Sequence, residues 1–472
     1  MSHRSRRLGW IAFPVILAAG WSCGVLAPTR PAVDRVILIT IDTLRADHLS
    51  AYGYVRATSP FFDELAEQGV LFENTVAPIA STVPSHASLF TSLCPLQHGV
   101  LKNGHRLSRS HVTLAELFRD RGYLTAGVVS TLGQFGAGQL DQGFAYFDEP
   151  SEADVAHGIR YRSAATVIER AIEWLETIHG QERFLLWIHL FDPHLPLRPP
   201  SDHYDLLRAA ADGQGLESYW LETQHVDGDF FRDRDNMLHR ITEYDAEIRY
   251  VDQELRRLFA YCEHRGIHDR CVWVITSDHG EGCGNHAWWG HGKHIYNEQL
   301  RIPLLFHFPS REDPGRRVED LVATVDIGPT LLELAGDDPA RLPERQGFSL
   351  QPLFHSGRIP RTDVFSQRRV FEGPPPRGVP PEKANYETGA KYALQTLRHK
   401  YIHRTDGGDE FYDLIGDPYE TENRIGTASA ERDRMREALL DRVASLEASA
   451  PGETLRVDER TRRQLESLGY TH

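Results

Sequence analysis

Three runs that consist mainly of apolar residues stand out after the first thirty residues of the chain. They span residues 36–41, 184–191 and 271–277. A continuous apolar run is typical of a strand that is covered on both faces, since a half-exposed strand alternates polar and apolar side chains. Amphipathic stretches with helical spacing lie between and beyond these runs, at residues 61–68, 113–121, 161–179 and 241–265. Buried strands that alternate with helices predict an α/β fold with a mostly parallel central sheet flanked by helices.

Each of the three predicted strands ends in residues that can bind a metal ion. These residues are Asp42 after the first strand, Asp192 and His194 after the second, and Asp278 and His279 after the third. The carboxyl ends of parallel strands meet at one edge of a sheet, and ligands bind there in such folds. A single Asp at a strand end is usually a cap or turn residue, but three such ends predict a metal or catalytic cluster.

A hydroxyl group lies at the predicted start of the helix near residue 82. Ser81 or Thr82 fits the cap of this helix, and Pro84 fits its first turn. Helix capping and helix initiation alone account for these residues, without a catalytic role. The exposed N–H groups of a helix start also favour a phosphate or sulfate group, so a hydroxyl there is well placed to attack an anionic ester.

A glycine-rich segment follows the third predicted strand, over residues 278–294. It contains four histidines and Lys293, one of only five lysines against 47 arginines in the chain. Glycines let the backbone approach a ligand closely. The choice of Lys in an Arg-rich chain points to a required ammonium group, although a solvated loop with incidental histidines is the alternative interpretation.

Taken in order, these motifs resemble those of the sulfatase family, within the alkaline-phosphatase-like superfamily. The similar segments comprise the first metal-ligand strand, the catalytic signature, the later metal and sulfate-binding motifs and two late markers, at residues 39–53, 82–91, 278–280, 291–293, 326–332 and 400–420. The resemblance implies a sulfatase-like catalytic domain over residues 33–340. It also implies a smaller C-terminal α+β subdomain over residues 341–472.

Several positions depart from the family pattern. Thr82 stands where sulfatases have a Cys or Ser that is converted to formylglycine, a conversion that is not expected of Thr. His86 replaces the signature Arg, Thr43 replaces the second residue of an Asp-Asp pair, and His279 replaces an Asn. Superfamily members with a Thr nucleophile act on phosphoryl groups, so the departures favour phosphorus chemistry or an unusual sulfatase.

The motifs and the resemblance together predict a metal-dependent hydrolase of sulfate or phosphate esters. One divalent ion (Ca²⁺, Mg²⁺, Mn²⁺ or Zn²⁺, undecided) would be held by Asp42, Thr82, Asp278 and His279. The ion would activate the Thr82 hydroxyl as the nucleophile. Lys293, His194 and His86 would neutralise the oxygens of the tetrahedral group, and His194 or His291 would protonate the leaving alcohol.

Two other classes of function fit the same residues. A transferase would move a phospho-head-group onto an envelope glycan or lipid, with a sugar hydroxyl in place of water. A degenerate member would only bind anionic glycans, but retention of Asp42, Thr82, Asp278, His279 and Lys293 together argues against it. The expected partner is therefore a small-molecule, glycan or lipid ester. A polar insertion at residues 195–237 is expected either to form part of the active-site rim or to be a surface excursion.

The first thirty residues predict export. They contain four arginines and no acidic residue, and an apolar run covers residues 8–28. This pattern is typical of a signal peptide, or of an uncleaved anchor that would tether the protein to a membrane. The expected location is periplasmic or extracellular.

The charge balance excludes one class of partner. The chain carries 52 basic and 67 acidic residues, a net charge of -15, and residues 31–472 alone carry 48 basic and 67 acidic residues. Such an acidic surface argues against nucleic-acid binding, and it requires a local positive pocket for an anionic substrate. An exported chain can also form disulfides. Cys94, Cys262, Cys271 and Cys283 allow three full pairings, and a local bond between Cys262 and Cys271 is one candidate.

Overall fold

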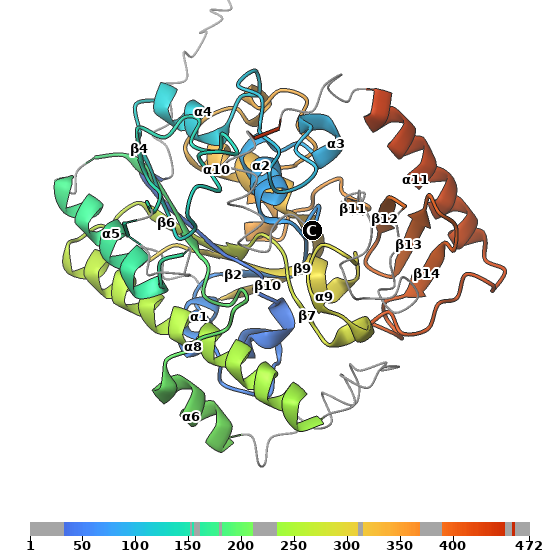
Figure 1. Cartoon of the computed structure of the whole chain (residues 1–472). Coiled ribbons are helices and arrows are strands. Elements are labelled where there is room, and N and C mark those ends of the chain that lie inside the picture. The colour runs from blue at the N-terminus through green and yellow to red at the C-terminus, as the bar shows by residue number, and fades with distance from the viewer. Residues whose placement is uncertain are drawn as a thin grey trace, which may run out of the picture. The chain divides into compact units, whose positions relative to one another are not determined.

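The computed structural model describes residues 33–151, 153–154, 161–178, 182–210, 234–309, 315–368, 389–448 and 456–457 (Figure 1). The predicted leader at residues 1–30 and the greater part of the insertion at residues 195–237 lie outside these ranges. Among the helices of the described ranges, none combines the length and apolar character needed to cross a membrane. Export and tethering therefore stay predictions.

An eight-stranded mixed sheet forms the centre of the fold. Its strands, in spatial order, are β10 (Arg316–Ala323), β2 (Val70–Val76), β9 (Arg301–His307), β6 (Cys271–Ser277), β1 (Arg35–Ile41), β5 (Phe184–Leu190), β3 (Leu124–Val129) and β4 (Tyr146–Asp148). Only β9 among these eight runs antiparallel to its neighbours. Every residue of β1, β5 and β6 is buried, as their continuous apolar sequences predict. The predicted fold class is confirmed.

Helices cover both faces of this sheet (Figure 1). One core cluster joins one face to α1 (Pro60–Ala66), α5 (Ala164–Thr177) and α8 (Arg234–His264). The other cluster joins the opposite face to α2 (Thr82–Thr91), α4 (Leu114–Asp120) and α10 (Ile327–Leu334). Three further helices of the described ranges are α3 (Pro95–His98), α6 (Ser201–Ala210) and α9 (Asn297–Leu300). Because helices bury both faces of the sheet, the strand ends that carry the candidate ligands are held in fixed positions.

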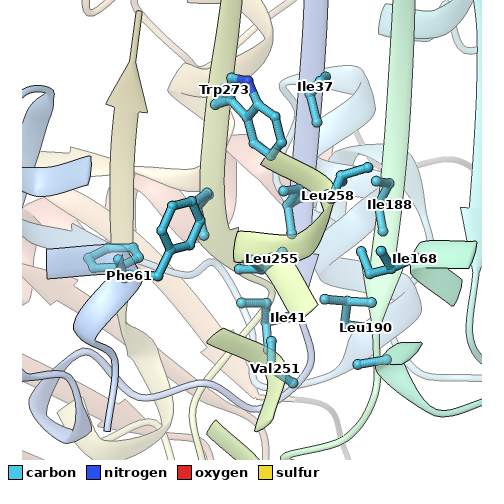
Figure 2. Close-up of a cluster of buried hydrophobic side chains, with 14 of the residues drawn as sticks. Ile37, Ile41, Phe61, Ile168, Ile188, Leu190, Val251, Leu255, Leu258 and Trp273 are labelled. Carbon is cyan, nitrogen blue, oxygen red and sulfur yellow. The ribbon is translucent and has the colours of Figure 1, made fainter. Parts of the chain in front are cut away.

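Figure 2 shows how α8 packs on the sheet: Leu258 lies near Ile37 and Ile188, and Leu255 lies near Ile41. Leu258 is fully buried. We expect Leu258→Ala to lower the free energy of unfolding by about 2–5 kcal/mol, because it removes buried apolar contacts and leaves a cavity. Urea unfolding measures this loss. Leu206→Ala is the control, since Leu206 is 51% exposed, and an equal effect of both changes would contradict the packing.

A second, antiparallel sheet follows near the C-terminus. It contains β11 (Val364–Arg368), β12 (Lys391–Gln395), β13 (His399–Arg404) and β14 (Glu410–Asp413), and α11 (Ala430–Ala448) packs on it (Figure 1). Contacts group Pro31–His472 into one compact unit. The predicted boundary between residues 340 and 341 stays a prediction.

The cysteines correct one expectation from the sequence. Cys94, Cys262, Cys271 and Cys283 are all buried free thiols, so the local disulfide between Cys262 and Cys271 is not formed. Both side chains belong to the apolar core beneath α8, and burial raises the pKa of the Cys262 thiol to about 12. Nearness in sequence suggested a pairing, but packing in the core determines where these side chains lie.

Candidate active site

The ends of β1 and β6 bring three predicted metal ligands together. The two strands are parallel neighbours, and Ile41 pairs with Ser277, so Asp42 and Asp278 leave the sheet side by side. One ligand atom from each of Asp42, Asp278 and His279 lies within 4.8 Å of the others. His279 Nε2 is 3.9 Å from Asp42 Oδ1 and 3.5 Å from Asp278 Oδ2. Sheet register alone therefore assembles this cluster.

Four candidate ligand atoms of this cluster are buried and lack a hydrogen-bond partner within the described ranges. Within the described ranges, both carboxylate oxygens of Asp42, Oδ2 of Asp278 and Nε2 of His279 have no hydrogen-bond partner. Burial, followed by repulsion from Asp278, raises the pKa of Asp42 well above its usual value. Unpaired buried carboxylates are costly unless a cation binds them. Carboxylate oxygens and one imidazole nitrogen suit a divalent metal ion, so the residues fit the predicted cofactor.

Thr82 is the first residue of α2. The Val83 N–H and the Ser81 hydroxyl both donate to Asn103 Oδ1, at 2.9 and 3.3 Å, so Asn103 satisfies the start of this helix. Thr82 Oγ is fully buried and has no partner in the described part of the chain. Ser85 Oγ donates to the Asp278 carbonyl at 2.7 Å, which holds this turn of α2 against the end of β6. The Thr82 hydroxyl is thus not used to cap its own helix.

His86 lies one turn further along α2, next to Asp278 of the cluster. Its Nδ1–H donates to the Thr82 carbonyl at 2.8 Å, and its Nε2 accepts from the Thr40 hydroxyl at 2.9 Å. Its Nδ1 is also 3.9 Å from Asp278 Oδ2. Burial lowers the pKa of His86, which favours the neutral ring. These contacts support a role in positioning Thr82, and the predicted neutralisation of substrate charge stays a prediction.

His189 is a site residue that the sequence did not single out. It lies on β5, paired with Thr40 of β1, and its ring stacks on that of His86 with centroids 5.0 Å apart. Its Nε2 is 3.7 Å from Asp42 Oδ2. His86, His189 and Asp278 form a second group of candidate ligands within 4.8 Å. The feature of the sequence that could have identified His189 is a histidine within an otherwise apolar predicted strand.

His194 and His291 also reach the cluster. Their ring centroids are 5.0 Å apart, and the His291 centroid is 4.5 Å from that of His279. His291 Nδ1 is 3.3 Å from Glu281 Oε2. Glu281 is buried, and its negative charge contributes to the raised pKa of Asp42. The structure therefore adds Glu281 to the predicted residues and places His194 and His291 near the candidate metal ligands.

Lys293 lies in the loop that returns toward α2. Its ammonium group is 4.2 Å from the centre of the Trp288 ring, and the side chain is 8% exposed. The preceding Gly292 has a φ of +82°, and a Cβ there would lie 3.4 Å from the Ala80 carbonyl. The loop thus runs alongside the segment that enters α2 at Thr82.

Sequence comparison shows to which family this arrangement belongs. A family profile described as Sulfatase matches residues 34–337, and a profile described as N-sulphoglucosamine sulphohydrolase, C-terminal, matches residues 284–449. The chain belongs to the sulfatase family. As a member of that family it is an ester hydrolase of the alkaline phosphatase superfamily, which confirms the predicted enzyme class.

Several relatives of this sulfatase-family enzyme cover nearly its whole length. N-acetylglucosamine-6-O-sulfatase of Bacteroides thetaiotaomicron is 24% identical, over 84% of this chain and 83% of the relative. The multifunctional alkaline phosphatase superfamily protein PehA of Trinickia caryophylli is 25% identical, over 87% and 95%. The crystal structure of phosphonate monoester hydrolase of Agrobacterium radiobacter superposes with a TM-score of 0.69 at 22% identity, over 89% of this chain and 96% of that one.

Asp192 has a different environment from Asp42 in this sulfatase-family fold. Its Oδ1 accepts the Ala164 N–H at 3.0 Å and so caps the start of α5. It belongs to neither candidate ligand group found among the described residues. Burial raises its pKa to about 7. The metal-binding role expected of Asp192 from its place after a strand therefore has no geometric support, and the cap explains the residue.

Glu247 on α8 is coupled to Asp192. Its Oε1 accepts the Arg198 N–H at 2.6 Å, and burial, followed by repulsion from Asp192, raises its pKa to about 9. The folded state thus holds this proton more tightly than the unfolded chain does, so stability falls as pH rises from about 4.5 toward 9. We expect Glu247→Gln to flatten the decline in melting temperature between about pH 6 and pH 8. The exposed Glu176→Gln is the control, and equal slopes in both variants would contradict the assignment.

Proposed function

We propose that this enzyme cleaves a sulfate or phosphate ester with Thr82 as its nucleophile. One divalent metal ion would be held by Asp42, Thr82, Asp278 and His279. The observation that carries this proposal is that all four side chains present buried ligand atoms without partners among the described residues. A bound divalent ion would lower the pKa of a coordinated hydroxyl and stabilise negative charge.

The residues around Thr82 suit the remaining steps of ester cleavage. Thr82 Oγ would bond to the phosphorus or sulfur atom while the bond to the alcohol oxygen breaks, and the hydroxyl proton would pass to the ring of His194 or His291. The positive end of the α2 dipole and the Lys293 ammonium would stabilise the charge on the other oxygens. His194 or His291 would give a proton to the leaving alcohol, and a water molecule would then release the anion from Thr82.

The nucleophile favours phosphorus chemistry over the usual sulfatase route. Thr82 cannot supply the hydrated aldehyde that formylglycine offers, so the anion must leave by attack of water on its central atom. A relative described as a phosphonate monoester hydrolase has the same fold. Other relatives are described as sulfatases of sugars. A structure with the same fold is described as a complex with its substrate, D-glucosamine-2-N,6-O-disulfate. We therefore propose a substrate from the phosphate, phosphonate or sulfate esters of sugars or lipids.

A substrate panel with metal reconstitution tests this function. The protein is stripped with chelator, supplied with Mg²⁺, Ca²⁺, Mn²⁺ or Zn²⁺, and assayed on an aryl sulfate, a phosphate monoester, a phosphate diester and a phosphonate monoester. We expect turnover of at least one class and its restoration by a metal. Anion binding without any turnover would favour the glycan-binding alternative. A Thr82 adduct released by a sugar hydroxyl but not by water would favour the transferase.

We also propose that the protein acts outside the cytoplasm, on the basis of residues 1–30. The arginines before the apolar run of residues 8–28 support this location. Fractionation of expressing cells, with mass spectrometry of the mature N-terminus, tests it. A full-length chain in the cytoplasmic fraction would contradict the proposal.

A further inference from the structure

A series of hydrogen bonds leads from the central sheet to Thr82. The indole Nε1 of Trp187, on β5, is 3.0 Å from the hydroxyl oxygen of Thr40, on β1, and that oxygen is 2.9 Å from His86 Nε2. His86 Nδ1 in turn is 2.8 Å from the Thr82 carbonyl oxygen. All four residues are at most 1% exposed, so water does not compete for these bonds. We call these three hydrogen bonds the His86 relay.

The two ends of the His86 relay fix the direction of its hydrogen bonds. An indole N–H can only donate, so Trp187 donates to the Thr40 hydroxyl oxygen. A carbonyl oxygen can only accept, so His86 Nδ1–H donates to Thr82. A neutral histidine has a single N–H, so His86 Nε2 is the acceptor for the Thr40 hydroxyl. The relay therefore holds the His86 ring in one tautomer, with its proton on Nδ1.

Aromatic neighbours hold the Trp187 ring in place. Its ring centroid lies 4.8 Å from that of Phe90, on α2, and 5.1 Å from that of Phe135, and both pairs are edge-to-face. Such pairs stabilise one another beyond the area that they bury. Trp187 also belongs to the apolar cluster between the sheet and α2. The indole N–H is thus presented to Thr40 in a fixed direction.

The His86 relay joins the strand that precedes a candidate metal ligand to the helix that carries the predicted nucleophile. Thr40 lies near the end of β1, two residues before Asp42. His86 lies one turn after Thr82 in α2. Without the Thr40 hydroxyl, the His86 ring can rotate or change its tautomer, and the Thr82 carbonyl then loses a donor. A displacement of about 1 Å at a reacting group can lower a rate by about 10²-fold.

The relay also bears on the second group of candidate metal ligands. His86, His189 and Asp278 have possible ligand atoms within 4.8 Å of one another. A histidine binds a metal ion through a nitrogen that carries no proton. In His86, however, Nδ1 carries the proton that Thr82 accepts, and Nε2 accepts the hydroxyl proton of Thr40. These contacts favour a positioning role for His86 over a second metal site.

We propose that Thr40 and Trp187 are positioning residues for the Thr82 nucleophile, which they hold in place through the Nδ1–H tautomer of His86. Neither side chain would touch the substrate or the metal ion. Their contribution is to keep the His86 N–H directed at the carbonyl of residue 82, so that the Thr82 hydroxyl stays beside the candidate metal ligands. This assignment rests on the proposed function, in which Thr82 attacks the ester.

Removal of the Thr40 hydroxyl tests this role. Thr40→Val nearly keeps the size of the side chain, but it leaves His86 Nε2 without its donor. On the substrate that the panel identifies, with saturating metal, kcat should fall by about tenfold because Thr82 is less well placed, and KM should change by less than about twofold. Thr40→Ser keeps the hydroxyl and should restore most of kcat. In the His86→Ala background, Thr40→Val should lower kcat no further, because its effect passes through the His86 ring.

Thr125→Val is the matched control for a general loss of stability. Thr125 is a buried residue of β3, and its hydroxyl donates to the Gly143 carbonyl at 2.8 Å. The change should lower the melting temperature by an amount comparable to that of Thr40→Val, but it should leave kcat unchanged. If Thr40→Val does not fold, Trp187→Phe takes its place, since it removes the donor at the start of the relay and keeps an aromatic ring.

The outcomes separate the positioning role from the proposed function. An undiminished kcat in folded Thr40→Val or Trp187→Phe, or an equal loss of kcat in Thr125→Val, would overturn the positioning role. A further loss of kcat in the His86→Ala background would overturn it as well. Nitrogen NMR of the chain labelled at its histidines, assigned with His86→Ala, should show the His86 proton on Nδ1, and a proton on Nε2 would overturn the relay. A wild-type chain that turns over no substrate would instead overturn the proposed function.

Discussion

Replacing Thr82 by Ala should reduce turnover of every active substrate by at least about 10³-fold, because it removes the group that bonds to phosphorus or sulfur. The Thr82 hydroxyl has no partner among the described residues, so its loss breaks no structural hydrogen bond. Metal content should fall less than activity, since Asp42, Asp278 and His279 remain. Steady-state kinetics and elemental analysis of the same preparations measure both effects. Thr82→Ser, which keeps the hydroxyl, should keep measurable activity.

Ser81→Ala is the matched control for this result. Ser81 is the adjacent hydroxyl residue, and its Oγ donates to Asn103 at 3.3 Å instead of lying unpartnered. We expect only a several-fold loss, from a weakened start of α2. Full activity of Thr82→Ala on every substrate turned over would end the proposed mechanism. A larger loss in Ser81→Ala than in Thr82→Ala would move the nucleophile to residue 81.

The parts of this site that follow strand ends could be predicted from the sequence. The apolar runs before Asp42 and Asp278 predict buried strands, and neighbouring parallel strands place their following residues side by side. The helix start at Thr82 was predictable for a similar local reason, since Pro84 fits a first turn. Residues that are far apart in the sequence can still be predicted to lie together when each of them follows a strand that ends at the same edge of the sheet.

The positions of the remaining site residues depend on tertiary packing, which the pattern of the sequence does not predict. His189 sits within a strand buried on both faces, so no alternation of polar and apolar residues shows which face it occupies. Glu281 is positioned by the irregular backbone after β6. Cys262 and Cys271 are both free thiols buried in the same apolar core, and their spacing along the chain does not show whether two such thiols are joined.

Asp42→Asn should have opposite effects on activity and on the stability of the metal-free protein. Activity should fall by at least about 10³-fold, because a neutral amide binds a divalent ion far more weakly than a carboxylate does. In chelator, the melting temperature should stay equal or rise, because the change removes a buried acid that Asp278 repels. A bound metal stabilises only the folded state, so the rise in melting temperature on adding the activating metal should shrink in this variant.

Asp192→Asn is the control for this result, because it removes a buried carboxylate at a strand end without removing a candidate metal ligand. Asp192 also follows a central strand and is buried, but its Oδ1 accepts the Ala164 N–H at 3.0 Å. An amide oxygen can still accept that bond, so the metal-induced rise in melting temperature should remain at the wild-type value. Differential scanning fluorimetry with and without each metal measures the rise. An undiminished rise in Asp42→Asn would place the metal elsewhere. A cation held at the ends of β1 and β6 must interact with the Asp42 carboxylate, which has no hydrogen-bond partner among the described residues.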